Sequence, residues 1–93
     1  MARILKRINV MASSNPINLA KMRSGHSGMI EEIHGGFGLI ARLNALGIMP
    51  GKRITKISSM MARGPVTIEL DRVHVAIGFG MAKRIMVKLD QVE

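Results

Sequence analysis

Apolar and polar residues alternate over several short runs of this chain, most regularly in its second half. Residues 66–70, 73–77 and 85–89 place valine, isoleucine or leucine at every second position, which is the period of a half-buried β-strand. Residues 29–33, directly after Gly28, and residues 52–58, directly after Gly51, are two further candidate strands. The pattern therefore predicts five short strands.

One segment has helical spacing instead. Phe37, Ile40, Leu43 and Leu46 recur at intervals of three residues, so we expect a short amphipathic helix over residues 37–46. Phe37, Ile40 and Leu43 should face the sheet, because the sequence offers nothing else to cover its open side. Five short strands and one short helix indicate a mainly β fold, a small and partly open barrel.

Glycine and proline mark the connections between these elements. Gly47 follows the predicted helix, where a left-handed C-cap residue is common. Pro50-Gly51 suits the central positions of a type II turn, in which the second residue has a positive φ angle. Asp71-Arg72 joins two strands as a tight hairpin. Gly36-Phe37-Gly38 and Gly78-Phe79-Gly80 lack the third glycine of a dinucleotide-binding loop, so we interpret both as turns, the second with at most one turn of helix.

The first 16 residues differ in composition from the remainder of the chain. They carry basic residues without any acidic residue, and their apolar residues follow one stripe of a helix. We expect a flexible basic extension over residues 1–16, with an amphipathic helix on a membrane surface or a partner as the alternative. A single folded domain should occupy residues 17–93. Asn9 interrupts the apolar run that an export signal needs, so we expect that the protein is not exported.

Composition narrows the kinds of protein that this sequence can encode. Of its 93 residues 47% are apolar, yet there are two Phe, no Trp and no Tyr, so the core must be aliphatic. We expect Met29 and Met81 to fill gaps in that core. The absence of Cys excludes disulfides, thiolate zinc sites, iron–sulfur clusters and cysteine nucleophiles. No apolar run approaches about 18 residues, so we expect no membrane-spanning helix.

Candidate chemistry is sparse along the chain. The sequence has neither a nucleophile elbow nor a phosphate-binding loop, and we expect no enzymatic activity. Glu32 and His34 lie two residues apart on a predicted strand, so they share a face and could both reach one divalent cation. The sequence nominates no further ligand beside them, and we expect no resident cofactor. His74 should point outward, away from the side on which Val73 and Val75 pack.

The net charge of +8 is concentrated in two parts of the chain. Residues 1–25 hold five Lys or Arg residues and no acid, and residues 52–64 add four more. Such a distribution attracts acidic partners of any kind. A small basic barrel could bind RNA or DNA phosphates through the second part, although it lacks the interleaved aromatic residues on which bases stack. Its basic residues are Lys52, Arg53, Lys56 and Arg63.

One run of residues is more specific than its surroundings. It reads Arg42-Leu43, two further residues, Leu46-Gly47-Ile48, one residue, and Pro50-Gly51. Together with residues 19–25, 35–36, 64–66, 75–77 and 82–87, this run resembles FeoA, the ferrous iron transport protein A family. The resemblance covers about three quarters of the chain.

This resemblance implies an SH3-like barrel, in agreement with the five strands and one helix predicted above. It also implies a non-enzymatic accessory or regulatory role in ferrous iron uptake, in the cytoplasm or at the inner face of the membrane. The partner that it implies is the cytosolic part of a FeoB-type iron transporter, with no small-molecule substrate. A small basic barrel that binds RNA or DNA is the alternative function.

We expect the partner to dock where the predicted helix ends, because Gly47 and Pro50-Gly51 hold this exit rigidly. Apolar side chains presented there need little ordering on binding, and the basic side chains add electrostatic steering. Leu46 and Ile48 could instead belong to the core. The candidate residues are Arg42, Leu46, Ile48, Met49, Pro50, Lys52 and Arg53.

Overall fold

A single curled sheet of antiparallel strands organises the molecule. The computed structural model describes residues 15–59 and 63–90. In chain order the elements are β1 (Ile17–Asn18), the 3-10 turn η1 (Leu19–Lys21), β2 (Ser27–Ile33), α2 (Phe37–Ala45), β3 (Arg53–Ser59), β4 (Val66–Leu70), β5 (Val73–Ile77), α3 (Phe79–Ala82) and β6 (Ile85–Leu89). The expectations for residues 1–14 and for the tip of the loop at 60–62 lie outside the described residues.

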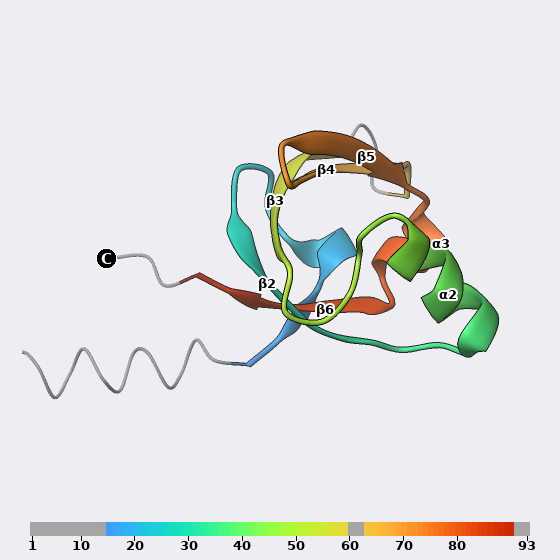
Figure 1. Cartoon of the computed structure of the whole chain (residues 1–93). Helices are drawn as coiled ribbons and strands as arrows, with labels where there is room; N and C mark the ends of the chain where they lie inside the picture. The colour runs from blue at the N-terminus through green and yellow to red at the C-terminus, as the bar shows by residue number, and fades with distance from the viewer. Residues whose placement is uncertain (1–14, 60–62, 91–93) are drawn as a thin grey trace, which may run out of the picture.

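The five predicted strands are all present, as β2 to β6, and the very short β1 joins them. The six strands are ordered β1-β6-β2-β3-β4-β5, and every neighbouring pair is antiparallel. Figure 1 shows the sheet curling so that β4 and β5 lie across from β2 and β6, with β3 connecting the two sides. Register shifts in β2 and in β3 mark the places where those strands bend. The prediction of a mainly β, barrel-like fold is confirmed.

The interior of the curl is aliphatic, as the composition predicts. Alternate side chains of β4 are buried, and in β6 the side chains of Ile85 and Val87 are buried in the same alternating pattern. Met81 packs against this core, but Met29 is 42% exposed, so the prediction that it fills the core is wrong. The buried apolar residues are Leu19, Met22, Ile30, Leu43, Ile48, Ile54, Val66, Ile68, Leu70, Ile77, Ala82, Ile85 and Val87.

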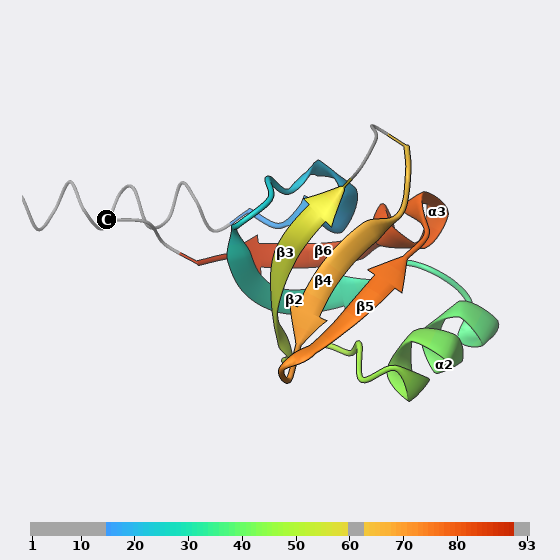
Figure 2. The same ribbon diagram turned by 90° about the horizontal axis from the view of Figure 1, so that it is seen from above.

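The open end of the sheet is covered by η1 and not by the helix. In Figure 1 the η1 turn (blue) lies in the middle of the curl, and Figure 2 shows it at one end of the sheet. Leu19 and Met22 are buried there. Because this turn already covers the end, α2 need not do so, and both views show α2 reaching away from the sheet.

Helix α2 therefore contacts the core through less of its surface than the spacing of its apolar residues predicts. Leu43 is buried and Ile40 is half-buried, as expected. Phe37 is 94% exposed, so the prediction that it faces the sheet is wrong. The reason is geometric: Phe37 begins the helix, at the end that lies farthest from the sheet in both views.

The two Gly-Phe-Gly segments are helix starts. Gly36 is the N-cap of α2 and Gly78 is the N-cap of α3, both with extended backbone. The interpretation of residues 36–38 as a turn is wrong, whereas the single helical turn expected after residue 78 is confirmed. Among the described residues, no helix is long and apolar enough to cross a bilayer.

The tight turns have the predicted backbone geometry. Gly47 and Gly51 have φ angles of +87° and +93°, which a side chain would strain. Lys52 donates its N–H to the Met49 carbonyl at 3.2 Å, which closes the turn around Pro50-Gly51. Asp71 and Arg72 both have positive φ angles, the signature of the two-residue hairpin that joins β4 to β5.

Candidate docking surface

The exit of α2 is fastened to the sheet by backbone hydrogen bonds. Ile48 donates its N–H to the Leu43 carbonyl at 2.9 Å, and Gly51 donates to the Ile30 carbonyl of β2 at 2.8 Å. In return, Ile30 donates to the Lys52 carbonyl at 2.8 Å. The segment between α2 and β3 is therefore held at both ends, which limits the conformational entropy that a binding partner would have to remove.

The candidate residues of this segment divide into buried and exposed ones. Ile48 is completely buried, so it belongs to the core, which is the alternative that the sequence left open, and it drops out of the candidate set. Leu46, the C-cap of α2, is 47% exposed. Arg42 and Pro50 are exposed, and Met49 is half-buried. We call the remaining residues the helix-exit surface: Arg42, Leu46, Met49, Pro50, Lys52 and Arg53.

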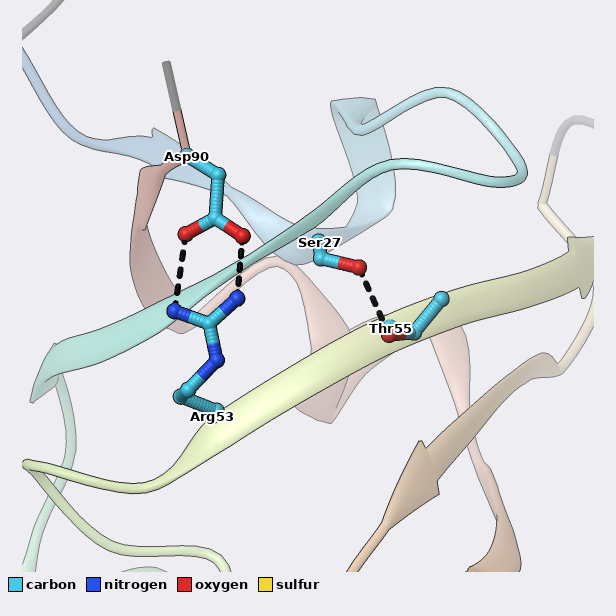
Figure 3. A network of polar contacts seen from close by, with 4 residues as sticks. All are labelled: Ser27, Arg53, Thr55 and Asp90. Atoms are coloured by element: carbon cyan, nitrogen blue, oxygen red, sulfur yellow. Dashed lines mark hydrogen bonds and ion pairs between the residues drawn. The ribbon is translucent and has the colours of Figure 1, made fainter. Parts of the chain in front are cut away.

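The two basic residues at the start of β3 are engaged in ion pairs. Lys52 Nζ lies 2.8 Å from Asp71 Oδ2, in the β4–β5 turn. The Arg53 guanidinium forms a bidentate pair with Asp90, in which Nη1 lies 3.0 Å from Oδ1 (Figure 3). Hydrogen bonding and then charge attraction by Asp90 raise the pKa of Arg53. These carboxylates offset part of the positive charge that the sequence assigns to this surface.

A hydroxyl pair lies next to this ion pair and joins β3 to β2. Ser27 Oγ and Thr55 Oγ1 are 2.7 Å apart and half-buried, and the two residues stand opposite each other in the β2–β3 register (Figure 3). Such cross-strand pairs stabilise one register over its alternatives. The backbone of β3 at Arg53 is thus held in place by this hydroxyl pair as well as by the ion pair with Asp90.

Lys56 is the residue whose role the sequence interpretation missed. It is 2% exposed, and its ammonium donates to the carbonyl oxygens of Leu19 (3.2 Å), Ala20 (3.1 Å) and Met22 (2.6 Å). Burial lowers the pKa of Lys56. Its assignment to a phosphate-binding basic surface is therefore wrong, because the ammonium points into the molecule. Strand alternation could have found it, since Lys56 stands two residues after the buried Ile54.

Glu32 and His34 do come together, as their spacing predicts. His34 Nε2 lies 3.3 Å from Glu32 Oε2, and their side chains are 56% and 60% exposed. A protein cation site needs three or four ligands. Within the described ranges, no group of three or more His, Cys, Asp or Glu residues could hold a metal ion.

A strongly curled sheet of short antiparallel strands, closed at one end by a 3-10 turn, is an SH3-like barrel, and this one presents a rigid helix exit. A family model described as the FeoA domain matches residues 17–89 of the chain. The Fe(2+) transport protein A of Methanocaldococcus jannaschii is 34% identical over 70 residues, which are 75% of this chain and 83% of that protein. This chain belongs to the FeoA family.

Solved structures agree with that assignment. The crystal structure of an iron uptake regulatory protein, FeoA, is 35% identical and superposes with a TM-score of 0.74, over 81% of this chain and 97% of that one. A manganese-dependent transcriptional repressor superposes with a TM-score of 0.75 at 20% identity, over 81% of this chain and 42% of the repressor. The second similarity concerns the fold alone.

Proposed function

We propose that this protein is a non-enzymatic accessory module of ferrous iron uptake, which docks on the cytosolic part of a FeoB-type iron transporter. It works in the cytoplasm, at the inner face of the membrane where that domain lies. Membership of the FeoA family carries the proposal, because the relatives that match over most of their length are named for Fe(2+) transport and iron uptake regulation.

The helix-exit surface is the docking site in this proposal. It combines the half-exposed Leu46 and the half-buried Met49 with the exposed cation Arg42. The hydrogen bonds of Ile48 and Gly51 hold the surrounding backbone in place, so the free energy of docking is not spent on ordering a loop. An acidic rim around an apolar patch is the complementary partner surface.

The test is an affinity measurement against the transporter's isolated cytosolic domain. Arg42→Glu reverses an exposed charge and should slow association. Met49→Asp places a carboxylate in the apolar part of the contact and should weaken binding by roughly 10-fold or more. Both variants should stay folded, because neither side chain is fully buried.

A matched charge reversal serves as the control. Lys21 is exposed in η1. Figure 2 shows η1 beside the end of β3, away from α2, whereas Arg53 of the helix-exit surface lies at the start of that strand. Lys21→Glu changes the net charge as much as Arg42→Glu does, and it should leave the affinity nearly unchanged. Equal losses in the two variants, or salt-sensitive binding to unrelated oligonucleotides in place of the transporter domain, would contradict the proposal.

A further inference from the structure

The two edges of the sheet differ in how they meet solvent. β1 forms one edge and is two residues long, directly after Pro16, which has no N–H to offer. β5 forms the other edge and pairs with β4 over five consecutive residues. Native proteins usually blunt an edge strand by shortness, proline, charge or a bulge. β1 uses two of these devices, whereas β5 uses none of them.

The hairpin register determines which peptide groups of β5 point outward. A two-residue turn makes Leu70 and Val73 a hydrogen-bonded pair, and such pairs alternate along an antiparallel ladder. Val75 and Ile77 therefore also direct their N–H and C=O groups toward β4. The N–H and C=O groups of His74 and Ala76 point away from the sheet.

The side chains of β5 leave this edge open as well. No residue from Val73 to Ile77 is Lys, Arg, Asp, Glu or Pro, and the register with β4 has no shift. Val73 was expected to pack inward, but it is 58% exposed because no strand lies beyond it in the described part of the chain. An uncharged, regular edge with an exposed Val is suited to receive another strand.

We propose that β5 pairs with β5 of a second copy of this chain, in antiparallel orientation about a two-fold axis at Val75. In this register, His74 of each copy lies opposite Ala76 of the other, and each pair exchanges two backbone hydrogen bonds. Val75 lies opposite Val75 of the second copy. Val73 lies opposite the second copy's Ile77, on the face that already packs against the core, so its exposed side chain becomes covered.

Charge is what favours a second copy over a charged peptide at this edge. Because β5 itself carries no charged residue, the two-fold axis brings no like charges together despite the net charge of +8. Arg72, the nearest cation, lies opposite Gly78 of the second copy in this register. The contact is small, so we expect a dissociation constant in the micromolar to millimolar range.

Analytical ultracentrifugation of the full chain over that range of concentrations measures the dimer directly. Ala76→Pro removes an outward N–H and no bond to β4, at an edge position where proline is tolerated. It should raise the dissociation constant roughly 10- to 100-fold, because two of the four interchain bonds are lost. Ala76→Ser keeps the N–H and should dimerise like the wild type.

A charge variant covers the case in which Ala76→Pro does not fold. His74 and Ala76 are both exposed, and the double variant His74→Lys, Ala76→Lys places lysines opposite each other at both pairs. It should be monomeric, and mixing it with His74→Glu, Ala76→Glu should restore dimers. A mutational effect on folding alone would not produce this rescue.

Amide hydrogen exchange distinguishes the second copy from other occupants of the edge. The amides of His74 and Ala76 should become protected as the protein concentration rises, while Val75 and Ile77 stay protected throughout. A wild type that is monomeric at millimolar concentration overturns the proposal. Protection of these two amides only after the transporter domain is added also overturns it, and assigns the edge to that partner. Either outcome leaves the affinity test of the helix-exit surface unaffected.

Discussion

Two cations on the same strand, Arg53 and Lys56, have opposite surroundings. Arg53 points outward and pairs with Asp90 in solvent, with its side chain 58% exposed. Lys56, three residues later, is buried and donates to three backbone carbonyls. A strand turns successive side chains to opposite faces, so an odd separation puts the two cations on opposite sides of β3.

The comparison teaches that a buried charge can act as a structural clamp. The residues before β2 form a short turn whose carbonyls have few backbone donors, and a buried carbonyl without a partner destabilises the fold. Lys56 supplies one donor group to Leu19, Ala20 and Met22 at once. On the outer face of β3 the cation Arg53 instead forms a solvated ion pair with Asp90.

The largest effect is expected from Lys56→Ala. The substitution removes the ammonium from the carbonyls and leaves a cavity, and together these should lower the free energy of unfolding by about 3–5 kcal/mol. Urea denaturation followed by circular dichroism measures this loss. A loss below about 1 kcal/mol would mean that η1 does not depend on Lys56.

Lys56→Met separates the charge from the packing. Methionine fills most of the same volume without a donor, so only the hydrogen bonds to η1 are lost, and the destabilisation should be about 1–3 kcal/mol. Hydrogen exchange should show increased opening of residues 19–22, while the amides of β4 keep their protection. A variant as unstable as Lys56→Ala would show that the clamp acts through its donors alone.

The pH dependence of stability sharpens the contrast further. Burial lowers the pKa of Lys56 in the folded protein below the usual value of 10.5. At a pH in the window between the pKa of Lys56 in the folded protein and its pKa in the unfolded chain, the unfolded chain therefore holds a proton that the folded protein has released. Linkage then makes the free energy of unfolding rise with pH through that window, and level off above the unfolded pKa. The difference between wild type and Lys56→Met, measured by urea denaturation at each pH, should show this rise. A difference that falls with pH would mean that the folded state prefers the ammonium form.

The sequence predicted well those elements that are encoded locally, by the alternation of apolar and polar residues or by the residues of a tight turn. Alternation located β2 to β6, and Gly47 and Pro50-Gly51 located the turns with their positive φ angles. The elements without a local period, β1 and η1, were missed. That omission caused the error at Phe37, because without η1 the helix was the only candidate to cover the open end of the sheet.

The candidate surface was harder to predict for a related reason. Spacing nominates Leu46 and Ile48 equally, yet burial separates them completely, because Ile48 follows the Gly47 turn into the core. Asp71 and Asp90 lie 19 and 37 residues from the cations that they pair with. Contacts over such separations depend on the sheet's register, which no local pattern specifies.

The smallest effect is expected from Arg53→Gln. The ion pair of Arg53 with Asp90 is solvated, so its charge attraction is screened and offset by the entropy of ordering two side chains. Arg53→Gln should destabilise the fold far less than Lys56→Met does. This loss of stability should shrink further at molar salt, where the Debye length is about 3 Å. The losses caused by the Lys56 variants should change little with salt, because the contacts of Lys56 are buried.

A double-mutant cycle that combines Arg53→Gln with Asp90→Asn, run at low and high salt, isolates the energy of the ion pair. A coupling energy that persists at high salt would show that Arg53 also acts through geometry, by fixing the end of β6 to β3.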